Sequence, residues 1–222
     1  MDAHIYPAEQ ARYDWTSDHR NLWKYWPGVD DLKAKAKAEG LWNLFLPHEY
    51  GDYSPGLTNL EYAPLAEIMG RAPWSSEVFN CAAPDTGNIE VLAKFGSDAQ
   101  KKQWLAPLLA GEIRSAYVMT EPQVASSDAT NIECSIVADG DDYVVNGRKW
   151  WISGIMDPRC KLLLLMGKSN PENSRHTQHS TIIIPRETPG IHIVRNQAVF
   201  GSMHSPGGES ELRLENVRVP KS

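Results

Sequence analysis

Apolar residues in the first half of the chain recur every three or four positions, the spacing that places them on one face of a helix. Two segments with this spacing follow residues that commonly cap helices. Thr58 precedes one, and Ser97 begins an S-x-x-Q capping box before the other. Further helices are expected at 32–39 and 86–95, each followed by a glycine. These patterns predict an all-α helical bundle domain over residues 1–114.

The pattern changes after residue 114, where short apolar runs rich in Val and Ile alternate with turn residues. The expected strands are AYVM, ECSIVA, YVV, KWWI, KLLLLM, TIIIP, GIHIV, ELRL and VRVP. Asn146-Gly147, between YVV and RKWW, has the composition of a type I′ turn and predicts a two-residue hairpin. The sequence therefore predicts an antiparallel, β-barrel-like domain over residues 115–222 and the α+β class overall.

Composition excludes several kinds of protein. The net charge of −6, with basic residues scattered along the chain, argues against a nucleic-acid partner. Cys81, Cys134 and Cys160 lack CxxC spacing and are expected to be reduced, partly buried thiols. The longest apolar run, 162–166, is too short for a membrane span, and no targeting segment is evident at the N-terminus.

Familiar catalytic and metal-binding motifs do not occur in the sequence. It has no P-loop, HExxH, GxSxG or GxGxxG after a strand. His176 and His179 form an HTQH pattern in a polar segment, which favours a solvated loop over a metal site. Glu209 and Glu211 are expected to be solvated at the entry of a strand.

Two segments are more suggestive of a ligand site. In YVMTEPQVASSD, a proline ends a strand and a loop of small residues follows, in which Ser126 and Ser127 could donate to a phosphate. An ordinary turn has a similar composition. In WWISG, strand alternation places Trp151 and Ser153 on the same side. The tryptophan could stack on a flavin or a base, or fill a core.

The order of these segments resembles the flavin-binding signature of the acyl-CoA dehydrogenase family, in which Y-x-x-T-E-P, a small-residue loop and W-I-T or W-I-S follow one another. GLWNLFLPHEYG and the stretch from APDTGN to GEIRSAY resemble the family's N-terminal helical domain, and TPGIHIV and LENVRVPKS resemble the end of its middle domain. NCxAPDTGN, TEPxVASSDATNIE and KWW are most similar to family members ten and eleven and their bacterial relatives. The resemblance covers nearly the whole chain.

This resemblance implies FAD as the cofactor and assigns residues to it. The implied cofactor-binding residues are Tyr117, Val118, Met119, Thr120, Ser126, Ser127, Trp151, Ile152 and Ser153. Ser127 would contact the FAD pyrophosphate and the acyl-CoA substrate, Trp151 would cover one flavin face, and Ser153 would lie near N5. The Gln-Val-Ala-Ser-Ser loop is one residue longer than the common form and lacks its glycines, which leaves open the serine that meets the phosphate.

In the family, a glutamate removes the α-proton while a β-hydride passes to flavin N5, and that glutamate belongs to a C-terminal helical domain. We expect this domain to be absent from the chain, so no catalytic residue and no metal ligand is assigned. One hypothesis is a truncated or partial FAD-dependent acyl-CoA dehydrogenase of fatty acid β-oxidation, an oxidoreductase acting on CH–CH. The alternative is a non-catalytic flavin- or acyl-CoA-binding or interaction module.

The resemblance also implies partners and a compartment. A fatty acyl-CoA would be the substrate and an electron-transfer flavoprotein the electron acceptor. The full-length family implies a homo-oligomer. The compartment would be the cytoplasm in a bacterium, and the mitochondrion or peroxisome in a eukaryote.

Overall fold

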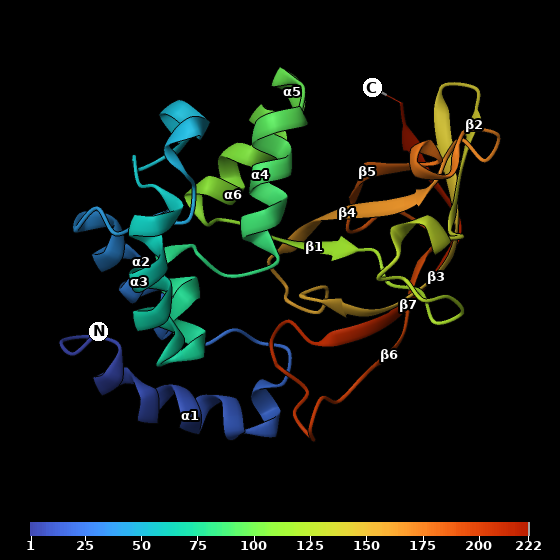
Figure 1. Ribbon diagram of the computed structural model, residues 1–222. Helices are drawn as coiled ribbons and strands as arrows, with labels where there is room; N and C mark the ends of the chain where they lie inside the picture. Colours follow the sequence, from blue (N-terminus) through green and yellow to red (C-terminus); the bar gives the residue numbers. More distant parts are fainter. Residues whose placement is uncertain (222) are drawn as a thin grey trace. The chain divides into compact units, whose positions relative to one another are not determined.

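The computed structural model describes residues 1–221 and contains a helical unit and a β unit (Figure 1). The chain divides into compact units at Met1–Ile113 and Arg114–Ser222. The predicted α+β class, with helices first and a sheet second, is confirmed. No helix within the described residues is long and apolar enough to cross a membrane.

The helical unit contains both predicted capping boxes. Its helices are α1 (Glu9–Ser17), α2 (Gly28–Ala38), α3 (Asn59–Gly70), α4 (Asp85–Phe95), α5 (Asp98–Gln100) and α6 (Ala106–Ala110). The Thr58 hydroxyl accepts from the N–H of Glu61 at the start of α3, and the Ser97 hydroxyl accepts from that of Gln100 at the start of α5. Both predicted caps are confirmed. Each involves residues only three positions apart, so the sequence alone could reveal it. Helix α1 was not predicted.

The end of α6 is held by side chains from distant segments. The last carbonyls of a helix have no partner within the helix, so they need donors from elsewhere. The carbonyls of residues 108–110 accept from Asn80 Nδ2 (2.9 Å), Trp42 Nε1 (2.7 Å) and Lys37 Nζ (2.6 Å), in that order. Because one donor comes from α2 and two from loops, these bonds fix α6 within the helical unit.

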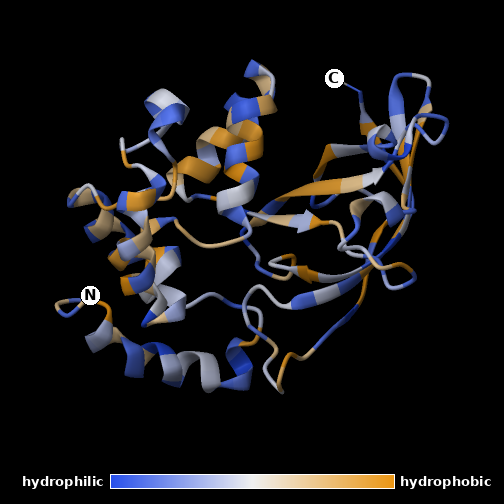
Figure 2. Ribbon diagram, in the orientation of Figure 1, coloured by the Kyte–Doolittle hydropathy of each residue, from blue (hydrophilic) through white to orange (hydrophobic). Residues whose placement is uncertain are grey.

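The β unit is one seven-stranded sheet with the order β1-β4-β2-β3-β7-β6, and β5 pairs with β4. The strands are β1 (Arg114–Val118), β2 (Ser135–Asp139), β3 (Asp142–Ser153), β4 (Cys160–Lys168), β5 (His179–Pro185), β6 (Ile191–Asn196) and β7 (Glu209–Pro220). Most pairs are antiparallel, but β1 runs parallel to β4. Figure 2 shows hydrophobic residues concentrated along β4, whose side chains are part of the buried core.

The predicted hairpin at Asn146-Gly147 is wrong. Both residues lie inside the continuous strand β3, at a point where its register with β7 shifts. Asn146 Oδ1 accepts from the N–H of Asn216, and a Cβ on Gly147 would lie 2.7 Å from Cys134 Sγ. The glycine is required by this close approach and not by a turn. The hairpin that joins β2 to β3 turns instead at Gly140, which has a φ of +60°.

Candidate functional site

The end of β1 and the bulged part of β3 come together in the β unit. After Val118, which is fully buried, the chain leaves the strand, and the carbonyl of Thr120 accepts from the N–H of Trp150 at 2.9 Å. This bond joins the two segments that the sequence singled out. Tyr117, Met119 and Thr120 are partly exposed beside it. The hydroxyl of Thr120 has no hydrogen-bond partner within residues 1–221.

A buried ion pair lies behind the turn that follows Thr120. Lys149 is fully buried, and its ammonium donates to Glu121 Oε1 (2.9 Å) and to the carbonyls of Met119 (2.7 Å) and Met166 (2.8 Å). The Glu121 carboxylate also accepts from two backbone N–H groups, at residues 133 and 134, both at 2.8 Å. All three protons of the ammonium are therefore used, and the pair fixes the main chain of residues 119–121.

Neither partner of this pair was identified from the sequence. In the sequence, Glu121 stands out only as part of the T-E-P motif, and Lys149 only as part of KWW. Two adjacent cations, Arg148 and Lys149, at the start of an aromatic run were the available signal, but the partner of Lys149 lies 28 residues away in the chain. Spacing alone does not reveal such a contact.

The two candidate serines lie in different environments. Ser126 is buried, and its hydroxyl accepts from the N–H of Glu121 at 2.8 Å and approaches the carbonyl of Val124 at 3.2 Å. Ser127 is exposed, and its hydroxyl has no hydrogen-bond partner in the described part of the chain. The loop is thus closed by Ser126, which leaves Ser127 available to a ligand.

The end of this loop is held by Asp128, whose carboxylate accepts from the backbone and side chain of Thr130. These hydrogen bonds, together with Arg175 at 2.8 Å, hold the pKa of the Asp128 carboxyl below its usual range. Arg175 belongs to the polar segment that the sequence predicted to be a solvated loop. His179 of the same segment lies instead in β5, partly buried, with Nε2 2.9 Å from the carbonyl of Ile132.

Trp151 lies in a bulge of β3. Its φ is +54°, the register with β7 breaks between Lys149 and Ile152, and its side chain is 41% exposed. The N–H of Trp151 donates to Gln197 Oε1 at 3.2 Å. Ile152 is 1% exposed and belongs to the core, so only its main chain could contact a ligand. Trp151 and Ser153 are both exposed, with buried Ile152 between them, although the bulge interrupts the regular strand at Trp151.

Ser153 and the carboxylates of Glu209 and Glu211 form two clusters on strands β3, β6 and β7. Ser153 Oγ donates to Glu209 Oε2 at 2.7 Å. Glu211 is 1% exposed and pairs with Arg195 (2.7 Å) and Arg148. The hydrogen bond from Arg195, followed by that from Arg148, lowers the pKa of the Glu211 carboxyl. The prediction that both glutamates are solvated is wrong for Glu211. It is also wrong for most of the Glu209 side chain, which is 17% exposed.

The cysteines are free and buried, as predicted. Burial is the main cause that raises the pKa of the Cys134 thiol to about 11, with a further contribution from the nearby Glu121 carboxylate.

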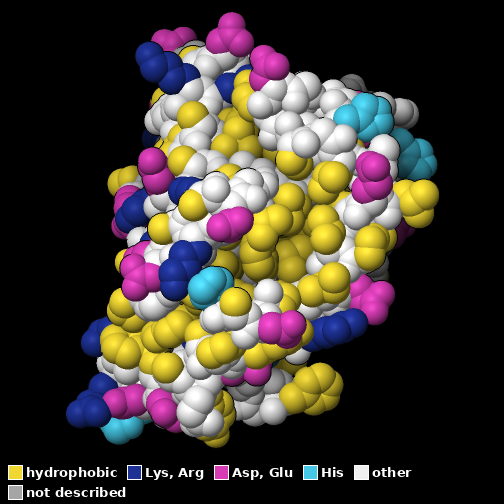
Figure 3. Space-filling model, turned by 90° about the vertical axis from the view of Figure 1, so that its left-hand side faces the viewer, with side chains coloured by type: hydrophobic (Ala, Val, Ile, Leu, Met, Phe, Trp, Pro, Cys, Tyr) yellow, Lys and Arg dark blue, Asp and Glu magenta, His cyan; other side chains and the backbone are white. Residues whose placement is uncertain are grey.

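Charged side chains of both signs are interspersed on the face shown in Figure 3. This distribution agrees with the absence of clustered basic residues in the sequence.

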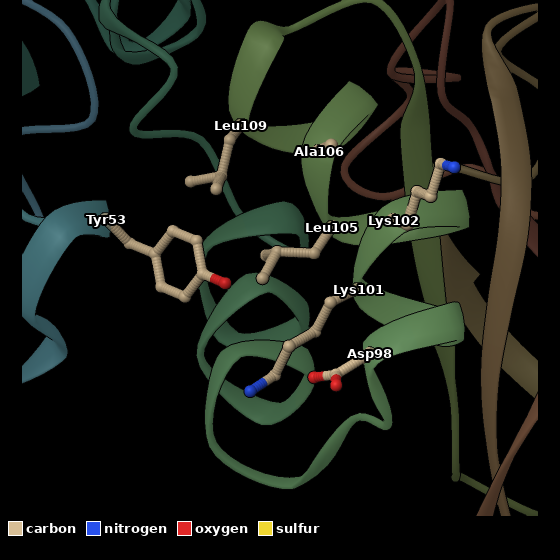
Figure 4. Close-up of a pocket in the computed structure, with 7 residues that line it drawn as sticks. All are labelled: Tyr53, Asp98, Lys101, Lys102, Leu105, Ala106 and Leu109. Atoms are coloured by element: carbon tan, nitrogen blue, oxygen red, sulfur yellow. The ribbon is translucent and has the colours of Figure 1, made fainter.

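A separate depression lies in the helical unit (Figure 4). Its lining residues are Tyr53, Asp98, Lys101, Lys102, Leu105, Ala106 and Leu109. None of them belongs to the candidate site at β1 and β3. Buried Leu105 provides an apolar floor, and the charged groups stand at the rim.

A helical unit followed by a curled sheet is the fold of solved acyl-CoA dehydrogenases. The structure of an acyl-CoA dehydrogenase homologue from Mycobacterium abscessus is 48% identical, with a TM-score of 0.93, over 99% of this chain and 55% of that one. A more distant structure, an FAD complex of PigA, shares the fold at 22% identity and a TM-score of 0.73, over 100% of this chain and 55% of that one.

Family models identify both parts of the chain. Residues 10–112 match the acyl-CoA dehydrogenase N-terminal domain and residues 116–217 match the acyl-CoA dehydrogenase middle domain. The chain therefore belongs to the acyl-CoA dehydrogenase family. Acyl-CoA dehydrogenase family member 10 of Mus musculus is 53% identical over 100% of this chain, and the chain spans 21% of that protein.

Proposed function

We propose that this chain provides the FAD-binding and part of the acyl-CoA-binding surface of a fatty acyl-CoA dehydrogenase. The observation that carries the proposal is the hydrogen bond between Thr120 and Trp150, which brings the T-E-P turn and the W-W-I-S bulge together above the Lys149–Glu121 pair. Family membership supports the reaction class, and the FAD complex of PigA supports the cofactor.

The groups present at the site suit a flavin. Trp151 offers an exposed aromatic surface, and the hydroxyls of Thr120 and Ser127 have no partner within the described residues. A bound FAD would supply the acceptor for the β-hydride of the substrate. In the proposed arrangement, residues 117–120 contact the ring through main-chain groups and the Thr120 hydroxyl, and Ser127 donates to a phosphate oxygen.

We propose that the base that removes the α-proton lies outside the described residues. The family's base is a glutamate, and a base must lie within hydrogen-bond reach of the proton that it removes. Glu121 and Glu211 are each less than 5% exposed and ion-paired, and Glu209 accepts from Ser153. None of these carboxylates is available for that role. Transfer of electrons to an electron-transfer flavoprotein and assembly into a homo-oligomer are proposed on family membership alone.

A fusion protein tests this function. The chain would be joined to the part of the M. abscessus homologue beyond the matched region, loaded with FAD and mixed anaerobically with a fatty acyl-CoA. We expect the flavin absorbance to bleach. A folded, FAD-loaded fusion that no acyl-CoA of any length bleaches would overturn the dehydrogenase assignment.

Two serine variants provide a matched control for the phosphate contact. We expect Ser127→Ala to weaken FAD binding by about 5- to 10-fold, the effect of one lost hydrogen bond, with unchanged stability. Ser126→Ala should instead lower stability, because its hydroxyl closes the loop. The opposite pattern would assign the phosphate contact to Ser126.

A further inference from the structure

The Glu209 carboxylate lies between Ser153 and His204. Its Oε2 accepts the Ser153 hydroxyl proton at 2.7 Å, and its Oε1 lies 3.7 Å from His204 Nδ1. The Glu209 side chain is 17% exposed, whereas that of His204 is 48% exposed. Glu209 thus stands one hydrogen bond behind a hydroxyl that, by resemblance to the family, would lie near flavin N5 in the proposed FAD site.

The backbone around this contact is fixed without any ligand. Ser153 and Glu209 are direct partners in the β3–β7 ladder. Beyond them, the N–H of Gly154 donates to the carbonyl of Gly208 (3.2 Å) and that of Met156 to the carbonyl of Gly207 (3.0 Å). The carboxylate therefore faces the hydroxyl through strand pairing and not through a flexible loop.

We propose that Glu209 is a positioning residue that fixes the direction of the Ser153 hydroxyl proton at the flavin edge. This inference rests on the proposed function. A serine hydroxyl has one proton and two lone pairs. Because the proton is committed to Glu209, Ser153 Oγ offers only lone pairs to a neighbouring group and acts as an acceptor.

The direction of this hydroxyl affects the two oxidation states of a flavin differently. N5 accepts a hydrogen bond in oxidised flavin and carries an N–H after two-electron reduction. A Ser153 oxygen held as an acceptor suits the N–H, while a freely rotating hydroxyl could donate to the oxidised form. Glu209 should therefore favour binding of the reduced flavin.

Two substitutions separate this effect from that of the negative charge. Glu209→Gln removes the charge but keeps an oxygen that accepts the Ser153 proton, whereas Glu209→Ala removes both. In the fusion protein, the ratio of the dissociation constants for oxidised and reduced FAD should be about 3- to 10-fold lower for Glu209→Ala than for Glu209→Gln. In a Ser153→Ala background the two variants should give equal ratios.

Glu215→Ala is the matched control. Glu215 lies on the same strand and also faces a histidine, with Oε2 3.3 Å from His192 Nε2, but it has no contact with Ser153. It should leave the ratio unchanged. Equal ratios for Glu209→Ala and Glu209→Gln, or a difference that persists without the Ser153 hydroxyl, would overturn the positioning role while FAD binding stands.

A measurement without flavin tests the same contact in the 222-residue chain. The unfolding equilibrium constants of Ser153→Ala, Glu209→Ala and the double variant form a thermodynamic cycle. We expect a departure from additivity of about 3- to 10-fold. Additive effects would overturn the inference, because the hydrogen bond would then hold nothing in place. A fusion protein that binds no FAD would overturn the proposed function and, with it, this inference.

Discussion

The buried Lys149–Glu121 pair provides the sharpest test of how the candidate site is held. Lys149→Met keeps the length of the side chain but removes the ammonium. The Glu121 carboxylate then keeps its two backbone donors and loses its counter-ion, while the carbonyls of Met119 and Met166 lose a donor. Removal of one partner of a buried pair typically costs about 3–5 kcal/mol. We expect a loss of that size in the free energy of unfolding of the β unit.

This loss is large compared with the stability of a domain. A unit of this size is expected to have a free energy of unfolding of roughly 5–15 kcal/mol. Denaturant unfolding should be followed through amides of the β unit, because two units need not unfold together. Lys161→Met is the matched control, since Lys161 lies on β4 with an exposed side chain, and it should change stability by less than about 0.5 kcal/mol.

A double variant separates the ion pair from the other contacts of Lys149. Glu121→Gln alone leaves a buried ammonium without its counter-ion, so it should also destabilise strongly. Combined with Lys149→Met, no charge of this pair remains buried, and the total loss should be smaller than the sum of the single losses by about 2 kcal/mol or more. Additive losses, or a Lys149→Met protein as stable as the Lys161→Met control, would refute the reasoning.

Four further predictions concern the surroundings of the site. Gly147→Ala should destabilise the chain by about 1–3 kcal/mol in denaturant unfolding, because a Cβ would lie 2.7 Å from Cys134 Sγ. Gln197→Ala should speed hydrogen exchange at the Trp151 amide by about 5- to 10-fold, since that amide loses its acceptor. The pKa of the Cys134 thiol rises from 9.0 to about 11, so its contribution to stability, measured by denaturant unfolding, is complete below pH 9 and should be lost as pH rises to about 11. The lowered pKa of the Glu211 carboxyl has the opposite effect on the pH dependence of stability. The contribution of this carboxylate to stability is complete above pH 4.5 and should be lost as the pH falls through the lowered pKa, which denaturant unfolding at acid pH would detect.

Local signals in the sequence predicted the parts of the fold that local contacts determine. The capping boxes at Thr58 and Ser97 each involve residues three positions apart, and both were found. The type I′ turn signal at Asn146-Gly147 is equally local, but no turn forms there. The long ladder between β3 and β7 continues through these residues, and the glycine serves the approach of Cys134. A sequence typical of a turn therefore stays in a strand when a neighbouring strand provides more backbone hydrogen bonds than the turn would.

Most of the residues predicted for the candidate site have at least partly exposed side chains, and Val118, Ser126 and Ile152 are the buried ones. Thr120, Ser127, Trp151 and Ser153 were selected by motif, and each is at least partly exposed. The buried groups behind them were missed because their partners are far apart in the chain. Arg148 and Glu211, for example, are separated by 63 residues. A sequence shows that a strand carries a charged residue, but it does not show whether that residue is buried or which opposite charge makes its burial tolerable.

The exposed residues of the candidate site depend on less exposed polar groups behind them. The exposed hydroxyl and indole groups would meet the ligand, and polar groups behind them hold them in place. Gln197 holds the backbone of Trp151, and Glu209 holds the hydroxyl of Ser153. A substitution at either buried residue would leave every predicted ligand contact in the sequence intact and still change binding. In the proposed FAD site, the motif residues would therefore depend on these partners for their geometry.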